Sequence, residues 1–445
     1  MAEARAKGQL REAVGHFSRI ATLAPDSPVR AAAQYDAAAA LIALKDWSQA
    51  ATVLEDFRTR YPKHALQAEL TPKLALVYTE KGSWAQAATE MERLSAAQAD
   101  PAQARAALWQ ALQLREKASA DTPAARTQLT QAYERYLKAY PQPLETALEA
   151  RYRLALLARA EGNAARELAL MREVFQADQA GADARTPRTR TLGAQAALAL
   201  AQPTAEAYRK IQLVEPLARQ LKAKKAKLED ALKAYAVAAD YGVAEVVTAA
   251  AFQSAALYQD FGRAMLASQR PKGLKKLELE QYNVMLEEQA YPFEEKATEL
   301  HEVNARRAAQ GIYDDWVKQS FAALRELRPV RYGKQERKAE GDPRSAPALA
   351  QLEQGLAFRQ AGQFDKARAA YEQALQLDPQ LAPAVLNLGI LLDLYLGDSA
   401  RALTQYERYL ALTPQGDASV SKWIADLKNR KPVPVAAAAV TQEKP

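Results

Sequence analysis

The pattern nearest to a metal-dependent catalytic motif is His-Glu-Val-Asn-Ala at residues 301–305. A zinc metalloprotease uses His-Glu-x-x-His on a helix, where two histidines one turn apart bind zinc and the glutamate acts as general base. Here Ala305 stands in place of the second histidine, and the other histidines, His16 and His64, lie far away in the sequence. We therefore expect no metal and no cofactor, and we predict an amphipathic helix with a polar rim.

Three adjacent acidic pairs, at residues 287–288, 294–295 and 314–315, have side chains suited to acid–base catalysis or cation binding. Neighbouring residues on a helix point about 100° apart, so the two carboxylates of one pair do not converge. The chain also lacks the Gly-x-Gly-x-x-Gly, P-loop and Gly-x-Ser-x-Gly patterns. The pairs are predicted to lie on solvated faces, and an enzyme with a site in residues 194–328 is the less favoured alternative.

Charge and residue usage exclude further kinds of chemistry. The chain of 445 residues has 60 basic and 53 acidic residues and no cysteine, which removes disulfides, thiolate metal sites and cysteine nucleophiles. No apolar run of about 18 residues could span a bilayer. The densest basic run comprises Arg219, Lys222, Lys224, Lys225 and Lys227. Because no aromatic residues are interleaved for base stacking, we predict a solvated face and no nucleic-acid partner.

The elements that position these residues are best defined near the C-terminus. Two consecutive stretches each carry a glycine, an alanine, a tyrosine and a proline at closely matching spacing: Gly355, Ala367, Tyr371 and Pro379, then Gly389, Ala402, Tyr406 and Pro414. Small residues let two antiparallel helices approach closely, tyrosine fills the gap between them, and proline ends the second helix. This pattern resembles the tetratricopeptide repeat (TPR) family. The resemblance implies an all-α, TPR-type right-handed superhelix that binds proteins and is not an enzyme.

The rest of the chain divides into blocks around these repeats. The N-terminal block is predicted to be a degenerate TPR array whose first repeat is truncated. The middle block has helices longer than TPR helices, which either continue the solenoid or pack against it as a compact bundle. The predicted blocks are the array at 1–185 with a loop at 181–193, the helical middle block at 194–328, a linker at 329–347, two repeats with a capping helix at 348–429, and a disordered tail at 430–445.

The two C-terminal repeats are predicted to form a largely apolar groove edged by charge. The residues predicted to line it are Leu349, Leu352, Leu356, Arg359, Leu386, Ile390 and Asp393. Some TPR domains hold the terminal carboxylate of a chaperone peptide through lysine and asparagine, but leucines occupy those positions here, so that class of ligand is disfavoured. The groove suits an amphipathic helix or an extended peptide of a partner protein. The alternative is that the middle block or the closing helix fills it.

Two further segments, residues 57–82 and 133–155, place a Tyr-Pro helix end before a helix that carries Leu-Ala. They resemble Gram-negative envelope TPR proteins such as the outer-membrane assembly lipoprotein of the β-barrel machine and the Tol-Pal-associated division coordinator. The resemblance implies a periplasmic or outer-membrane-associated adaptor in an assembly or motor complex. Membrane contact would then come only through a partner or through an anchor preceding Met1. A cytoplasmic scaffold or assembly factor of the same fold is the alternative.

Overall fold

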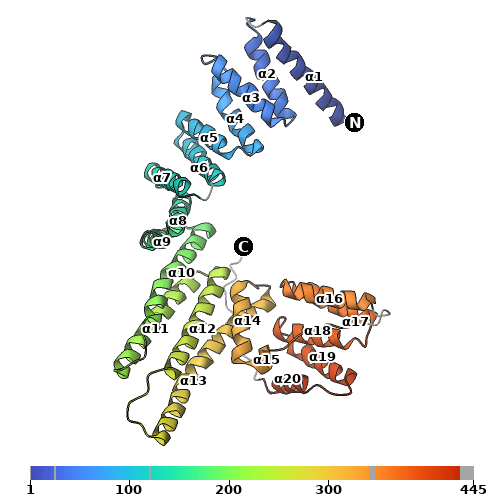
Figure 1. Ribbon diagram of the computed structural model, residues 1–445. Helices are drawn as coiled ribbons and strands as arrows, with labels where there is room; N and C mark the ends of the chain where they lie inside the picture. The colour runs from blue at the N-terminus through green and yellow to red at the C-terminus, as the bar shows by residue number, and fades with distance from the viewer. Residues whose placement is uncertain (1, 25–26, 120–121, 340–345, 431–445) are drawn as a thin grey trace. The chain divides into compact units, whose positions relative to one another are not determined.

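The computed structural model describes residues 2–24, 27–119, 122–339 and 346–430 (Figure 1). Of these residues 81% are helical and none lies in a β-strand, which confirms the all-α fold class. The chain separates into two compact units, Met1–Arg185 and Thr186–Pro445, which we call the N-terminal unit and the C-terminal unit. Within the described part, no helix is both long and apolar enough to cross a membrane.

The N-terminal unit is a succession of helices in which each packs on the next along the chain. Side chains that precede a helix cap its free N–H groups: Asp46 accepts from Gln49, and Asn163 accepts from Arg166. The helices are α1 (Ala2–Leu23), α2 (Arg30–Ala43), α3 (Trp47–Arg60), α4 (Gln67–Lys81), α5 (Trp84–Ala97), α6 (Pro101–Ala118), α7 (Pro123–Ala139), α8 (Leu144–Ala160), α9 (Ala164–Gln179) and the 3₁₀ turn η1 (Ala182–Ala184).

The first half of the C-terminal unit consists of longer helices: α10 (Pro187–Arg209), α11 (Leu217–Ala239), α12 (Ala244–Leu266), α13 (Lys276–Arg306), η2 (Arg307–Gln310) and α14 (Asp315–Leu327). The loop predicted over residues 181–193 is wrong beyond Thr186, because Thr186 and Thr189 form a capping box that starts α10. A proline inside a helical stretch also predicts a helix end at the Tyr291-Pro292 step, and that prediction is wrong. Helix α13 continues through Pro292, which is exposed to solvent. Proline has no N–H group, so the carbonyl four residues before it lacks its helical hydrogen bond and can bind water instead.

The second half of the C-terminal unit contains the two predicted repeats and their capping helix: α15 (Pro329–Tyr332), α16 (Ala346–Gln360), α17 (Phe364–Leu377), α18 (Ala382–Leu394), α19 (Ser399–Leu412) and α20 (Ala418–Asn429). Tyr371 and Tyr406 are fully buried between the helices of their repeats. A Cβ atom at Gly355 would lie 2.3 Å from Cε1 of Tyr371, and one at Gly389 would lie 2.8 Å from Cε1 of Tyr406. The two glycines therefore provide the space that the two tyrosine rings occupy.

The end of α13, η2 and α14 share one hydrophobic core with the repeats, whereas α10, α11, α12 and the rest of α13 form a separate cluster. Phe321 of α14 packs on Tyr395, which follows α18, with 4.9 Å between ring centroids, and Phe364 of α17 stacks on Tyr395 at the same distance. Tyr313 meets Phe364 edge to face. The two blocks that the sequence indicated, 194–328 and 348–429, are thus joined by buried aromatic contacts within one unit. The disordered tail predicted from residue 430 starts one residue too early, because Arg430 is ion-paired with Asp393, and residues 431–445 lie outside the described part.

Candidate protein-binding groove

Residues 333–339, which we call the groove segment, lie in the groove of the C-terminal repeats. They follow α15 without forming a helix, and Lys334 is buried while Gln335 and Lys338 are exposed. The sequence indicated a flexible linker here because the segment contains charged residues and no large apolar one. That prediction is wrong for residues 329–339, since α15 and the groove segment are held by specific contacts. Residues 340–345 lie outside the described part.

Lys334 occupies a closed pocket formed by three helices. Its ammonium group forms a fully buried ion pair with Asp393 of α18. The same Nζ atom lies 5.0 Å from the ring centroid of Tyr406 and 5.4 Å from that of Trp423, which is the distance range of cation–π contacts. Arg430 donates to the other oxygen of Asp393 at 2.7 Å. The carboxylate of Asp393, held by Arg430, and the two aromatic rings therefore define a pocket for a lysine side chain.

The two residues beyond Gln335 are held as specifically as Lys334. Glu336 accepts from Nε of Arg359 at 2.8 Å and from the hydroxyl of Tyr371 at 3.0 Å. Asn387 of α18 binds the main chain of Arg337 twice: its Oδ1 accepts from the N–H and its Nδ2 donates to the carbonyl, both at 2.8 Å. A side-chain amide that satisfies both main-chain groups of one residue acts as a neighbouring strand would.

The Arg337 side chain makes a third set of contacts. Its guanidinium donates to the hydroxyl of Tyr409 at 2.5 Å and to Asp417 at 2.6 Å, at the start of the capping helix. The groove segment therefore presents a lysine, a glutamate and an arginine to three separate sets of partners.

The ionisation of the lysine pocket follows from burial and from the two cations. Burial by itself would raise the pKa of Asp393, but the Lys334 ammonium and the Arg430 guanidinium hold it below its ordinary value. Burial lowers the pKa of Lys334, and Asp393 opposes this effect. Burial and the neighbouring Asp393 raise the pKa of the Tyr406 hydroxyl, which stays protonated and can donate. Asp393 is thus ionised at neutral pH and can pair with both cations.

The structure brings together four of the seven residues predicted to line the groove. Asp393 binds Lys334, Arg359 binds Glu336, and Leu356 and Ile390 line a cavity beside the groove segment. The other three lie in the core of the repeats: Leu352 and Leu386 are buried there and Leu349 packs at its edge. The prediction of a partner peptide in this groove stays a prediction, and part of the groove already holds the chain itself.

The sequence contained one overlooked signal for this site. Asn387 interrupts an otherwise apolar stretch, Ala-Val-Leu-Asn-Leu-Gly, within α18, and it is fully buried. A buried amide needs hydrogen-bond partners from outside its own helix, so such a residue indicates that polar main chain approaches. Lys334, Glu336 and Arg337 carried no comparable signal, because charged residues between two domains usually indicate a solvated linker.

A cavity of about 540 Å³ remains open beside the groove segment. Leu356, Ile390 and Tyr395 supply its apolar lining, and Arg325 of α14 and Lys338 of the groove segment supply positive charge. The repeats, the middle block and the groove segment all contribute to this one cavity. It is large enough for one or two side chains of another protein.

The histidine of the metalloprotease-like pattern is buried, and the predicted polar rim is wrong for it. Nδ1 of His301 lies 3.3 Å from Oγ of Ser320, and Asn304 donates to the same Oγ and to the carbonyl of Thr248. Burial lowers the pKa of His301 to about 4, so the ring is neutral at pH 7. These polar groups connect α12, α13 and α14 inside the core. They take no part in lining the cavity beside the groove segment.

The other candidate chemical groups of the sequence have mostly structural surroundings. The carboxylates of residues 287–288 and 294–295 are exposed, whereas Asp314 caps α14 by accepting from Val317 at 2.9 Å. In the basic run Lys224 is buried and donates to the carbonyl of Ile211 at 2.9 Å, and the other four residues are exposed. Within the part of the chain that the structure describes, no group of three acidic or histidine side chains could hold a metal ion.

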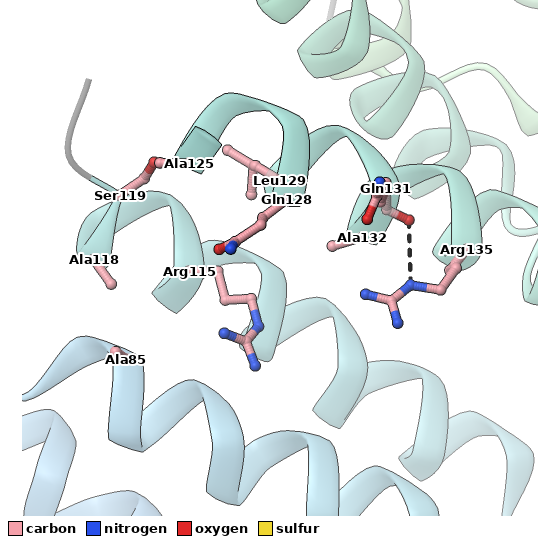
Figure 2. Close-up of a pocket in the computed structure, with 10 residues that line it drawn as sticks. All are labelled: Ala85, Arg115, Ala118, Ser119, Ala125, Gln128, Leu129, Gln131, Ala132 and Arg135. Carbon is pink, nitrogen blue, oxygen red and sulfur yellow. Dashed lines mark hydrogen bonds between the residues drawn. The ribbon is translucent and has the colours of Figure 1, made fainter. Parts of the chain in front are cut away.

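The N-terminal unit has a cavity of about 360 Å³ between α6 and α7 (Figure 2). Its walls are largely alanine and glutamine, and its two arginines have partners elsewhere. Arg115 is ion-paired with Glu92, and Arg135 donates to the carbonyl of Gln131 on its own helix. Figure 2 shows Arg135 joined to Gln131 by the one dashed line drawn among its labelled residues.

Comparison with known proteins identifies the repeats. A TPR repeat model matches residues 355–394, and a tetratricopeptide repeat model matches residues 32–64. Each unit of this protein therefore contains a stretch that matches a tetratricopeptide repeat model, and the described residues form an all-α fold. No curated protein sequence matches the chain.

Solved structures that match this chain include Naa15/Naa10 bound to HypK-THB, with 15% identity and a TM-score of 0.33. The match covers 95% of this chain and 59% of the other, so this protein spans about three fifths of that chain's length. Another is the crystal structure of the APC/C hetero-tetramer Cut9-Hcn1, with 12% identity and a TM-score of 0.22 over 96% of this chain and 94% of the other.

Proposed function

We propose that the protein is a non-catalytic scaffold whose C-terminal repeats bind an extended segment of a partner protein. The observation that carries this proposal is the groove segment itself. Asn387 binds both main-chain groups of Arg337, and separate pockets accept the side chains of Lys334 and Glu336. Recognition of main chain together with alternate side chains is how proteins bind extended peptides.

The open cavity gives a partner a place to begin. Its apolar lining at Leu356, Ile390 and Tyr395 lies next to exposed positive charge at Lys338. An apolar anchor surrounded by polar residues is the usual composition of a binding hot spot. A partner segment with an apolar side chain followed by acidic residues would complement this surface.

The experiment is affinity capture with the full chain as bait, followed by quantification of each captured protein. Leu356→Glu places a carboxylate in the apolar lining, and we expect it to weaken capture of a direct partner about tenfold, or about 1.4 kcal/mol. Lys366→Glu, an exposed change on α17, is the matched control. Both variants must keep the wild-type circular dichroism spectrum. Equal capture by the two variants would contradict the proposal.

We infer further that the scaffold works in a bacterial cell envelope, in the periplasm or at the outer membrane. The motivation is the sequence style of residues 57–82 and 133–155, with a Tyr-Pro helix end before a Leu-Ala helix. Cell fractionation of the natural gene product tests this placement. Recovery in the periplasmic or membrane fraction supports it, and recovery in the cytoplasm supports the alternative of a cytoplasmic scaffold.

A further inference from the structure

The groove segment is held almost entirely by polar and charged contacts. Residues 333–338, Gly-Lys-Gln-Glu-Arg-Lys, contribute no large apolar side chain to the core of the C-terminal unit. The apolar core of the repeats is formed by other residues, from α14 to α20. Buried ion pairs add little net stability, because the cost of removing charges from water offsets most of their attraction. The segment can therefore leave the groove without opening the hydrophobic core.

An empty groove would be unfavourable for a different reason. Asp393 has no exposed side-chain surface, and Lys334 is the partner of its Oδ2 atom, which otherwise has only the Tyr406 hydroxyl at 3.4 Å. Without Lys334, Arg430 would still pair with Oδ1 of Asp393, but the buried Oδ2 would lose its charged partner, which is unfavourable. The lysine pocket therefore requires an ammonium group. For the same reason, the buried side-chain amide of Asn387 requires main-chain N–H and C=O groups as hydrogen-bond partners.

The three sets of contacts also define a ligand sequence. The first pocket accepts a lysine, because Asp393, Tyr406 and Trp423 surround a single compact cation. The next residue points to solvent, as Gln335 does. The two that follow are a glutamate for Arg359 and an arginine for Asp417. Written along the chain, the pattern is Lys-x-Glu-Arg.

We propose that the groove segment is an internal ligand, and that the groove binds a partner segment with the pattern Lys-x-Glu-Arg by exchanging it for the chain's own copy. This inference rests on the proposed function and specifies its ligand. The chain's own segment has a high local concentration because it is covalently attached. A partner peptide must therefore outcompete it. The cavity beside the segment, which is lined by the buried Leu356 and Ile390 and by the segment itself, gives the peptide room to approach.

The test uses the full chain with the internal ligand disabled by the triple substitution Lys334→Ala, Glu336→Ala and Arg337→Ala. The probe is a fluorescent peptide of sequence Gly-Lys-Gln-Glu-Arg-Lys-Ala, which copies residues 333–339. Fluorescence anisotropy should show binding to the triple variant at least tenfold tighter than to the wild-type chain. The matched control chain carries Gln335→Ala, which changes an exposed residue of the same segment, and it should bind the peptide as weakly as the wild type.

Two altered peptides test the pattern. Alanine in place of the peptide's lysine should weaken binding to the triple variant at least tenfold, whereas alanine in place of its glutamine should leave binding unchanged. If the folded triple variant does not bind the peptide, or binds the lysine-free peptide equally well, the proposal is overturned. Loss of partner capture by Leu356→Glu could still stand in that case, so failure of the ligand pattern is distinguishable from failure of the scaffold function.

A second measurement applies if the triple variant does not fold. Hydrogen–deuterium exchange of the wild-type chain reports on the Arg337 amide, which donates to Asn387. A large excess of the peptide should speed exchange within residues 333–339 several-fold, because the displaced segment loses this bond. A scrambled peptide of the same composition should have no effect. Unchanged exchange with the native peptide would identify the segment as a fixed structural element and overturn the proposal.

Discussion

The N-terminal and C-terminal repeats fill the same position between their helices with different pairs of residues. At the spacing that separates Gly355 from Tyr371, the N-terminal unit has an alanine followed by leucine or methionine: Ala38 and Leu54, Ala75 and Met91, and Ala155 and Met171. The pairs in the C-terminal unit are a glycine with tyrosine: Gly355 with Tyr371, and Gly389 with Tyr406. A larger ring on one helix requires a smaller residue on the facing helix, because helix spacing is fixed by what lies between them.

The tyrosines add a polar end that leucine and methionine lack. The hydroxyl of Tyr371 donates to Glu336 of the groove segment, and the hydroxyl of Tyr406 lies 3.4 Å from Asp393. One side chain therefore packs the repeat and contacts the groove at the same time. The residue at this packing position, tyrosine in place of leucine or methionine, thus also determines whether the groove can hold a polar ligand.

The largest expected effect comes from removing one of the rings. Tyr371→Ala should lower the free energy of unfolding of the C-terminal unit by about 3 kcal/mol, because a large cavity forms beside Gly355. Urea denaturation followed by circular dichroism measures the change. The exposed change Lys366→Ala should stay within about 0.5 kcal/mol. A similarly small loss for Tyr371→Ala would mean that the ring is not a packing residue.

Acid should lower the free energy of unfolding of the C-terminal unit, which contains His301, by almost as much. The pKa of His301 falls from 6.5 to about 4 on burial, so the unfolded chain binds the proton first as pH is lowered. Stability from this residue is therefore present above pH 6.5 and lost between pH 6.5 and 4, by up to about 3 kcal/mol. His301→Gln should flatten this pH dependence in urea titrations. An unchanged pH dependence in the variant would assign the effect to other groups.

Gly389→Ala tests the small side of the glycine–tyrosine pair. Alanine favours helix by about 1 kcal/mol, but its Cβ would lie 2.8 Å from the Tyr406 ring, and such overpacking costs about 1–3 kcal/mol. We expect net destabilisation by thermal denaturation. The reverse exchange in the N-terminal unit, Ala75→Gly, should cost about 1–2 kcal/mol, through helix propensity and the loss of a buried methyl group. Stabilisation by Gly389→Ala would show that the tyrosine can move aside.

The smallest expected effect isolates the hydroxyl. Tyr371→Phe keeps the ring and removes one hydrogen bond to Glu336, which should cost about 1 kcal/mol in urea denaturation. Tyr235→Phe is the matched control in the same unit, because the buried Tyr235 hydroxyl has no hydrogen-bond partner among the described residues. That control should be neutral or slightly stabilising. If both variants lose the same free energy of unfolding, the Tyr371 hydroxyl does not connect the packing of the repeat to the groove segment.

Much of the fold could be predicted from the sequence, because its determinants are local. The glycine, tyrosine and proline of each C-terminal repeat lie within one helix pair, so their spacing indicates that pair directly. Asp393 and Arg359 were placed in the groove for the same reason, since both occupy the inner helix of a repeat. The helices of the middle block were harder to predict. Pro292 suggested a helix end, and only its solvent-facing side makes a continuous helix acceptable.

The occupant of the groove could not be predicted, because its contacts connect residues that are distant in sequence. Lys334 pairs with Asp393 and Arg337 with Asp417, and neither spacing follows from a local pattern. His301 was misassigned for a similar reason. Its ring is buried by α14, where Ser320 lies on the facing helix. Charged and polar residues look solvated in a sequence unless their partners are known.

The groove segment also limits how the chain can vary in length. Lys334 and Glu336 point into the groove while Gln335 lies outside, which is the two-residue alternation of extended chain. Deleting one residue after Tyr332 would exchange these sides and place the Gln335 amide where the Asp393 carboxylate requires a cation. A stretch with the composition of a spacer, in which insertions and deletions are normally harmless, is therefore as fixed in length as a strand inside a sheet.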